Sequence, residues 1–281
     1  MLKRQTSGSV ICTSCGVLVG INDATCYNCG RRNPGLWGFA PLIRALGQDM
    51  GFVPLVIGAC GIVFVLTLIY SGGNVGMRGV FGFLSPSTPA IIVFGASGIV
   101  PVQRLDRWWT VLSAGWLHGS ILHLLFNMMA VRQLAPAIAD LFGPGRMVII
   151  YVAGSIVGFT LSSVMPPFPF IGGASLTVGA SASIAALIGA LLAYGHRTGS
   201  SMATSQATSN LLMLAVYGLM MGSVINNLAH AGGVLGGYVA ARVLDPMKPE
   251  RIDHLTIAVV LLALSLLSIV WSVIHGQQFL A

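Results

Sequence analysis

The chain has 281 residues, of which 55% are apolar and only 7% charged, and its formal net charge is +7 at neutral pH. Soluble domains carry about 25% charged residues, so this composition excludes an ordinary water-soluble protein and indicates that most of the surface faces a lipid bilayer. Basic loops on the cytosolic side of a membrane explain the positive charge better than nucleic-acid binding does, and we expect no nucleic-acid partner.

The N-terminal 35 residues contain two cysteine pairs, Cys12-x2-Cys15 and Cys26-x2-Cys29. A glycine follows each pair and permits the tight turn of a metal-binding knuckle. The alternatives are two disulfides or a redox pair, but a cytosolic location disfavours disulfides. We therefore expect residues 1–35 to form a zinc-ribbon-like module with one structural Zn²⁺.

A linker, 36–50, precedes the expected membrane domain, 51–281. A helix needs about 20 mostly apolar residues to cross the hydrocarbon region. Seven candidate spans meet this description: 52–70, 117–135, 147–165, 176–194, 208–224, 226–244 and 255–274. The sequence therefore predicts an all-α, multi-pass integral membrane protein.

The basic residues predict the orientation of these spans. With the N-terminus in the cytosol, all of the 14 Lys and Arg residues except Arg78, Arg104 and Arg107 fall on the cytosolic side. These three exceptions share one long outer loop, 71–116. Its tryptophans are expected to lie at the headgroup level of the bilayer.

Three of the spans carry polar residues near their outer ends. The second contains His118, His123 and Asn127, the fourth contains Ser181, and the sixth contains His230. Because these spans run in the same direction, the polar groups lie at a similar shallow depth. A single His or Ser in a span can simply bond a backbone carbonyl. The agreement among three helices, however, favours a shared functional site.

These residue types suit acyl transfer by a serine nucleophile. Ser181 needs a base to remove its proton, and His230 is the natural candidate. No acidic residue lies in the outer part of a span, so we expect a dyad without a carboxylate. Side-chain N–H groups of Asn127 and His123, with the backbone N–H of Ser181, would stabilise the oxyanion. Catalysis of this kind needs no cofactor.

Small residues are expected to bring the two helices of the dyad together. The sixth span carries a doubled face of Gly232, Gly233, Gly236 and Gly237. The fourth span is expected to pack against this face with its own small residues, Gly179, Ser183, Ala186 and Ala190. Such faces allow the close backbone approach that a Ser–His contact requires.

Ser97, in "VFGASGIV", has a glycine-flanked setting similar to that of Ser181 in "TVGASASI". It lies in the outer loop, in an apolar run too short to span the bilayer. No histidine of a span matches its position, so its glycines are better explained as turn or interfacial residues. We expect Ser181, and not Ser97, to be the nucleophile.

The ordered blocks "HGSILHLLFN" (118–127), "GAS" (179–181) and "AHAGGVLGG" (229–237) resemble the rhomboid family of intramembrane serine proteases. The resemblance covers about 51–281. It implies a six-helix core with one added C-terminal helix, a Ser181–His230 dyad, and an oxyanion site at Asn127 and His123. It also implies transmembrane protein substrates cleaved near the outer face, with the fifth span as a lateral gate.

The sequence departs from the family pattern at Ala182, where glycine is usual, and at Thr110, where the family has the arginine of a Trp-Arg pair. Arg107 is a nearby substitute, and Asp140 stands where glutamate is frequent. The N-terminal module resembles small zinc ribbons of bacterial proteins that often mediate contacts. A protein partner for this module and a bacterial cytoplasmic membrane are therefore expected.

Two other readings compete with a protease. The first is an inactive rhomboid-like protein that binds membrane clients, although inactive relatives typically lack the serine or the histidine. The second is a transporter or channel that uses the polar layer as an ion path. The inner halves of the spans are apolar, which counts against a continuous polar path.

Overall fold

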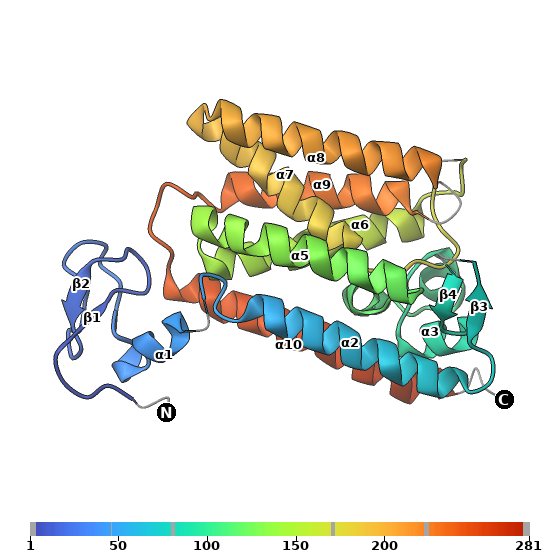
Figure 1. Ribbon diagram of the computed structural model, residues 1–281, viewed down its shortest axis with the longest axis horizontal. Coiled ribbons are helices and arrows are strands. Elements are labelled where there is room, and N and C mark those ends of the chain that lie inside the picture. Colours follow the sequence, from blue (N-terminus) through green and yellow to red (C-terminus); the bar gives the residue numbers. More distant parts are fainter. Residues whose placement is uncertain (1–3, 46, 80–81, 170–171, 222–224, 278–281) are drawn as a thin grey trace.

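The computed structural model describes residues 4–45, 47–79, 82–169, 172–221 and 225–277. Within them a long helix matches each expected span, and the helices run side by side in a bundle (Figure 1). They are α2 (Phe52–Ser71), α5 (Ile121–Phe142), α6 (Pro144–Val164), α7 (Ser181–Thr198), α8 (Ser201–Met220), α9 (Asn227–Val243) and α10 (Ile252–Gly276). The expected all-α polytopic fold is confirmed.

Some predicted boundaries were wrong by several residues. The second span was expected from 117, but α5 begins at Ile121, because the Ser120 hydroxyl caps the helix by accepting from the His123 N–H. The fifth span was expected at 208–224, whereas α8 starts at Ser201, and 222–224 lie outside the described residues.

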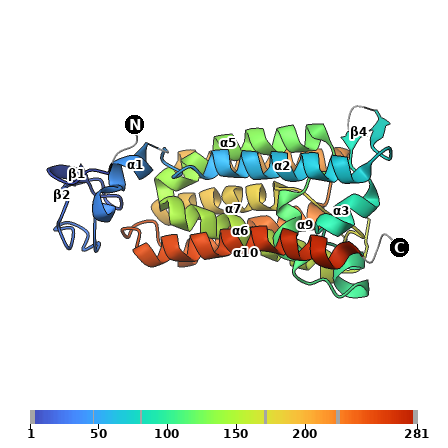
Figure 2. The ribbon, with the colours of Figure 1, turned by 90° about the horizontal axis from the view of Figure 1, so that it is seen from below.

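Among the described residues, four helices are long and apolar enough to cross a membrane by themselves: α2, α5, α6 and α10. The other three long helices are shorter or more polar. Of these, α7 lies inside the bundle, between the α2–α5 pair and α10 (Figure 2), and most of its side chains are buried. Helices that face protein do not need an unbroken apolar surface.

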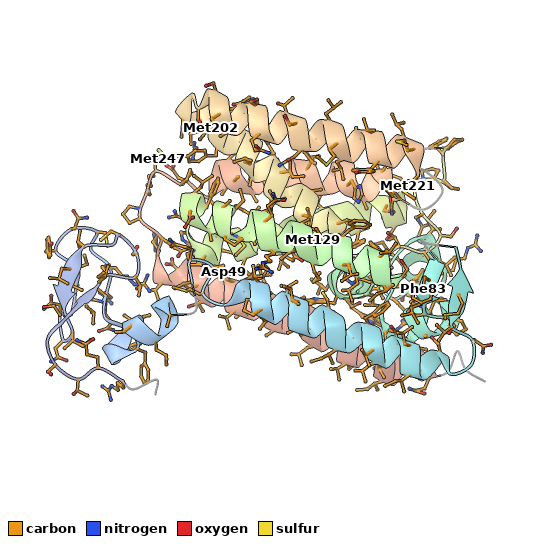
Figure 3. All side chains as sticks on the ribbon, viewed as in Figure 1. Asp49, Phe83, Met129, Met202, Met221 and Met247 are labelled. Carbon is orange, nitrogen blue, oxygen red and sulfur yellow. The ribbon has the colours of Figure 1, made fainter. Side chains whose placement is uncertain are left out.

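Lipid-facing surfaces are apolar, as expected of this class. Met129 on α5 and Met202 on α8 point away from the bundle (Figure 3) and are 66% and 81% exposed. On α10, apolar side chains such as Val259 and Leu267 are likewise exposed. Exposed apolar surface of this extent is stable only in contact with lipid.

The glycines of α9 divide between two neighbouring helices. A Cβ added at Gly233 would lie 2.2 Å from the Ala182 carbonyl oxygen, and one at Gly237 would lie 2.0 Å from that of Ala186, both on α7. Gly232 instead packs against Gly158 of α6. The doubled glycine face therefore allows α9 to approach α6 and α7 at once.

The face of α7 that packs against α9 differs from the one expected. Gly179 precedes α7 and faces His123 rather than α9. The small residues of α7 that meet α9 are Ala182, Ala186 and Gly189. Helical periodicity does not show which face of a helix meets a given neighbour, so the predicted face was correct only at Ala186.

The segment between α2 and α5 covers the end of the bundle at which α7 and α9 begin (Figures 1 and 2). It contains a hairpin and short helices: β3 (Gly76–Arg78), β4 (Gly82–Ser85), α3 (Thr88–Phe94), the π-helix Val100–Arg104, α4 (Thr110–Ser113) and the 3₁₀ helix Ala114–Trp116. Trp108 is 48% exposed, but Trp116 is buried in the apolar core, so its predicted interfacial position was wrong.

Arg107 links this segment to the last helix through hydrogen bonds. Its guanidinium is buried and donates to the carbonyl oxygens of Ile92 at 2.7 Å and of Ser272 on α10 at 2.9 Å. The indole of Trp109 donates to the Ser272 hydroxyl at 2.9 Å. Arg107 therefore holds the segment in place, although Thr110 occupies the position of the usual arginine.

The N-terminal module lies at the opposite end of the bundle (Figure 1). Its strands β1 (Ser9–Ile11) and β2 (Leu18–Gly20) pair antiparallel, and a 3₁₀ helix (Leu36–Gly38) and α1 (Ala40–Arg44) follow. The Ser14 hydroxyl donates to the Glu250 carbonyl oxygen at 2.6 Å, which joins the module to the α9–α10 loop. The domain boundaries at 35 and 50 stay predictions.

Glu250 also fastens the start of α6. Its carboxylate accepts from the Arg146 backbone N–H at 2.8 Å, while the Arg146 guanidinium donates to the carbonyl oxygens of Lys248 and Pro249. Burial raises the pKa of the Glu250 carboxyl even though Arg146 and Arg31 oppose this shift.

Candidate active site and cysteine cluster

Helices α5, α7 and α9 all begin at the same end of the bundle (Figure 2). Ser181 is the first residue of α7, and His230 lies in the first turn of α9, which starts at Asn227. His123 and Asn127 occupy the first two turns of α5. The shared depth expected from the parallel direction of these helices is therefore present.

Ser181 and His230 are in hydrogen-bond contact across two helices. The Ser181 Oγ lies 2.8 Å from the His230 Nε2. His230 is 8% exposed, and within the described residues its Nδ1 has no hydrogen-bond partner. A serine hydroxyl can thus pass its proton to this imidazole, and the pair has no orienting carboxylate in the described part of the chain.

His123 presents a donor beside Ser181. Its Nδ1 accepts from the Gly119 backbone N–H at 3.3 Å, which leaves the ring proton on Nε2. The Asn127 side-chain amide donates to the His123 carbonyl oxygen at 3.0 Å and keeps a second N–H. Two side-chain donors therefore accompany the free N–H groups at the start of α7.

Gly179 allows the His123 ring to approach the backbone just before Ser181. Its φ is +124°, which disfavours a side chain, and an added Cβ would lie 2.5 Å from the His123 Nε2 and 3.6 Å from the Asn127 Nδ2. The Gly179 N–H donates to the Ala114 carbonyl oxygen at 2.9 Å. The side-chain nitrogens of His123 and Asn127 therefore converge on Gly179, two residues before Ser181.

His118 was expected alongside His123 on one helix, but it precedes α5. Its ring is 1% exposed and packs edge-on against the His123 ring, with centroids 5.1 Å apart. It therefore shapes the environment of His123 from the loop.

Ala182 fits where glycine is usual because its neighbours are small. It is fully buried, and an added Cβ on Gly158 of α6 would lie 3.1 Å from the Ala182 methyl. The lack of a side chain at Gly158 leaves room for that methyl.

Ser97 is completely buried and lies among other serines rather than histidines. Its Oγ lies 3.1 Å from the Ser163 Oγ, and its backbone pairs with Thr177 in an isolated antiparallel bridge. Among the described residues no base is in hydrogen-bond contact with Ser97, so its hydroxyl lacks the activation that a nucleophile needs.

Asn226 was not singled out from the sequence. Its Oδ1 caps α9 by accepting from the Ala229 N–H at 3.0 Å, and its Nδ2 donates to the Thr177 Oγ1 at 3.0 Å. An asparagine directly before an apolar helical segment is a typical N-cap signal, so the capping role was readable from the sequence. The contact with Thr177 was not.

The four N-terminal cysteines form one cluster. Their sulfur atoms lie within 4.8 Å of one another, with Cys12 to Cys29 at 3.8 Å and Cys15 to Cys26 at 3.6 Å. The S–S edge of a zinc tetrahedron with Zn–S bonds of about 2.3 Å is about 3.8 Å. The cluster therefore fits a single metal ion.

The glycines that follow the cysteine pairs behave as expected. Gly16 and Gly30 have φ values of +76° and +70°, and their N–H groups donate to the carbonyl oxygens of Cys12 and Cys26. These two knuckle turns use the left-handed backbone that glycine adopts without strain.

Comparison with known proteins places the helical domain in a family. A model of the rhomboid domain matches residues 105–246, half of the chain. The Rhomboid protease GluP of Bacillus subtilis (strain 168) is 31% identical over 185 residues, which cover 64% of this chain and 35% of GluP. RHOMBOID-like protein 4 of Arabidopsis thaliana is 28% identical over 164 residues, 57% of this chain and 40% of that protein. The Putative rhomboid protease YdcA of B. subtilis is 30% identical over 147 residues, 52% of this chain and 71% of YdcA.

The chain thus spans well under half the length of the first two relatives. From the family match and the helical membrane fold together, the chain belongs to the rhomboid family.

Proposed function

We propose that this protein is an intramembrane serine endopeptidase that cleaves transmembrane segments of membrane proteins. The observation that carries the proposal is the 2.8 Å contact between the Ser181 Oγ and the His230 Nε2, made by two different helices at the same depth. The names of relatives such as GluP and YdcA, which are called rhomboid proteases, support the same activity.

In the proposed reaction Ser181 is the nucleophile and His230 the general base. The Ser181 oxygen bonds to the scissile carbonyl carbon while its proton moves to the His230 Nε2. The resulting oxyanion accepts hydrogen bonds from the His123 Nε2, the Asn127 Nδ2 and the Ser181 backbone N–H. One lost donor of this type costs about 10²–10³ in rate. His230 then protonates the leaving amine as the C–N bond breaks.

Hydrolysis of the acyl-enzyme completes the cycle. A water molecule gives a proton to the His230 Nε2 and adds to the ester carbonyl. The Ser181 oxygen then leaves and recovers its proton from His230. No cofactor enters either half of the reaction.

We infer that the Ser181 end of the bundle faces the outside, with the N-terminal module in the cytosol of a bacterial cell. This orientation follows from the distribution of basic residues. The helix α8 is the proposed entry side for a substrate helix, since its apolar side chains such as Leu212 and Leu219 are exposed and it packs mainly on α7.

We also propose that residues 1–35 bind one structural Zn²⁺ through Cys12, Cys15, Cys26 and Cys29. The module's apolar core is small, so the metal would supply most of its folding energy. Metal analysis of the purified full chain tests this: one zinc per chain is expected, and a Cys12→Ser, Cys26→Ser variant should bind none. Equal zinc in both proteins would contradict the assignment.

A fluorophosphonate probe tests the catalytic proposal. The Ser181 oxygen should form a bond to phosphorus as fluoride leaves, with its proton taken by His230, and the adduct should map to Ser181 by mass spectrometry. Purified protein in liposomes should also cleave a model single-pass substrate, and Ser181→Ala should not. An adduct on Ser97, or equal cleavage by wild type and Ser181→Ala, would refute the proposal. In the latter case, an inactive client-binding protein becomes the better reading.

A further inference from the structure

The amide of Asn226 connects the two helices that carry Ser181 and His230. Asn226 is the N-cap of α9, one turn before His230, and its Oδ1 accepts from the Ala229 N–H at 3.0 Å. This cap fixes the first turn of α9 and with it the start of the helix that holds the imidazole.

The same side chain reaches the segment that leads into α7. Its Nδ2 donates to the Oγ1 of Thr177, which lies four residues before Ser181, at 3.0 Å, and also to the Oγ of Ser162 on α6. Thr177 is 8% exposed, so its hydroxyl has little access to solvent. One amide therefore contacts the start of α9, the approach to α7 and the end of α6.

Thr177 is itself held from the other side. Its backbone N–H donates to the Ser97 carbonyl oxygen at 2.8 Å, and the Ser97 N–H donates to the Thr177 carbonyl oxygen at 3.1 Å. The Ser163 hydroxyl of α6 contacts both the Ser97 Oγ and the Gly98 N–H at 3.1 Å. Ser97, which lacks a base, thus anchors the segment that leads to Ser181.

We propose that Asn226 and Thr177 act as a pair of positioning residues that set the distance between the Ser181 Oγ and the His230 Nε2. The inference rests on the proposed function and adds to it two residues that touch neither the dyad atoms nor the oxyanion donors. A shift of about 1 Å in a reacting group can cost about 10²-fold in rate. The 3.0 Å hydrogen bond between Asn226, at the start of α9, and Thr177, in the segment before α7, limits such shifts.

Two substitutions separate positioning from folding. Asn226→Ser keeps an oxygen that can cap the Ala229 N–H, but the shorter side chain cannot also reach Thr177. Thr177→Val keeps the shape and the backbone bridge to Ser97 and removes only the hydroxyl. Thr67→Val is the matched control, because the buried Thr67 hydroxyl bonds only within α2, to the Phe64 carbonyl oxygen.

The readouts are the maximal rate of fluorophosphonate labelling of Ser181, the probe concentration at half of that rate, and the thermal midpoint of each full-length variant in detergent. We expect Asn226→Ser and Thr177→Val each to lower the maximal rate about 10- to 100-fold. The half-saturating concentration and the thermal midpoint should stay near the wild-type values. The double variant should lose no more than Asn226→Ser alone, because that substitution already removes the contact with Thr177 together with the one to Ser162.

Wild-type labelling rates in both single variants would overturn the positioning role while leaving the proposed function intact. Additive losses in the double variant would also overturn it, as would an equal loss in Thr67→Val. If Asn226→Ser unfolds, Thr177→Val alone decides, since it leaves the cap of α9 untouched. A wild-type protein that is not labelled at Ser181 would refute the proposed function and the inference together.

Discussion

Gly233→Ala probes the packing that brings the proposed dyad together. The new Cβ would lie 2.2 Å from the Ala182 carbonyl oxygen, where an ordinary contact starts at 3.4 Å. That oxygen belongs to the backbone of α7 and cannot rotate away, so α9 and α7 must separate by about 1 Å. The Ser181–His230 distance, now 2.8 Å, would then approach 4 Å and exceed hydrogen-bond range.

Two losses are expected from this separation. Overpacking of a well-packed interface costs about 1–3 kcal/mol of stability, and a misplaced base costs about 10²-fold in rate. The assay is fluorophosphonate labelling of Ser181 in detergent, followed over time beside a thermal unfolding scan.

Gly58→Ala supplies the matched control. Gly58 lies in α2, another long helix, and an added Cβ there meets no atom within 4 Å. This variant should label at the wild-type rate and gain slightly in stability, because alanine favours a helix over glycine by about 0.5–1 kcal/mol. The reasoning is refuted if Gly233→Ala labels as fast as wild type, or if Gly58→Ala loses as much activity.

Three further outcomes are expected. Gly179→Ala should lower the labelling rate about 10²-fold or more, because its Cβ would lie 2.5 Å from the His123 Nε2 and displace that donor; normal labelling would show that the His123 Nε2 is not an oxyanion donor. Folding should become less stable as pH rises through the raised pKa of Glu250, since the folded state favours the protonated carboxyl. In unfolding scans at several pH values, Glu250→Gln should remove that pH dependence, and an unchanged slope would assign it to another group. Metal removal by a chelator should expose Arg31, now 6% exposed, to trypsin; the same cleavage rate with and without chelator would contradict a metal-dependent fold.

The local sequence was sufficient to predict the long helices and to name the side chains that meet at one end of the bundle. Long apolar runs required helices because a backbone in lipid must satisfy its own hydrogen bonds. The shared direction of α5, α7 and α9 follows from counting spans, and it already brought Ser181 and His230 to one depth. The knuckle glycines, Gly16 and Gly30, could likewise be assigned from the cysteine spacing.

Only the tertiary structure decided which surfaces meet. The glycines of α9 face two helices because α9 lies between α6 and α7. The periodicity of the α9 sequence alone does not show which helices its glycines will meet. The segment around Ser97 looks like a nucleophile motif locally, but it is buried against Thr177 and Ser163, 80 and 66 residues away. Asn226 reads as a helix cap from its neighbours alone. Its second contact, with Thr177, joins segments 49 residues apart, and such long-range hydrogen bonds depend on the packing of the whole bundle.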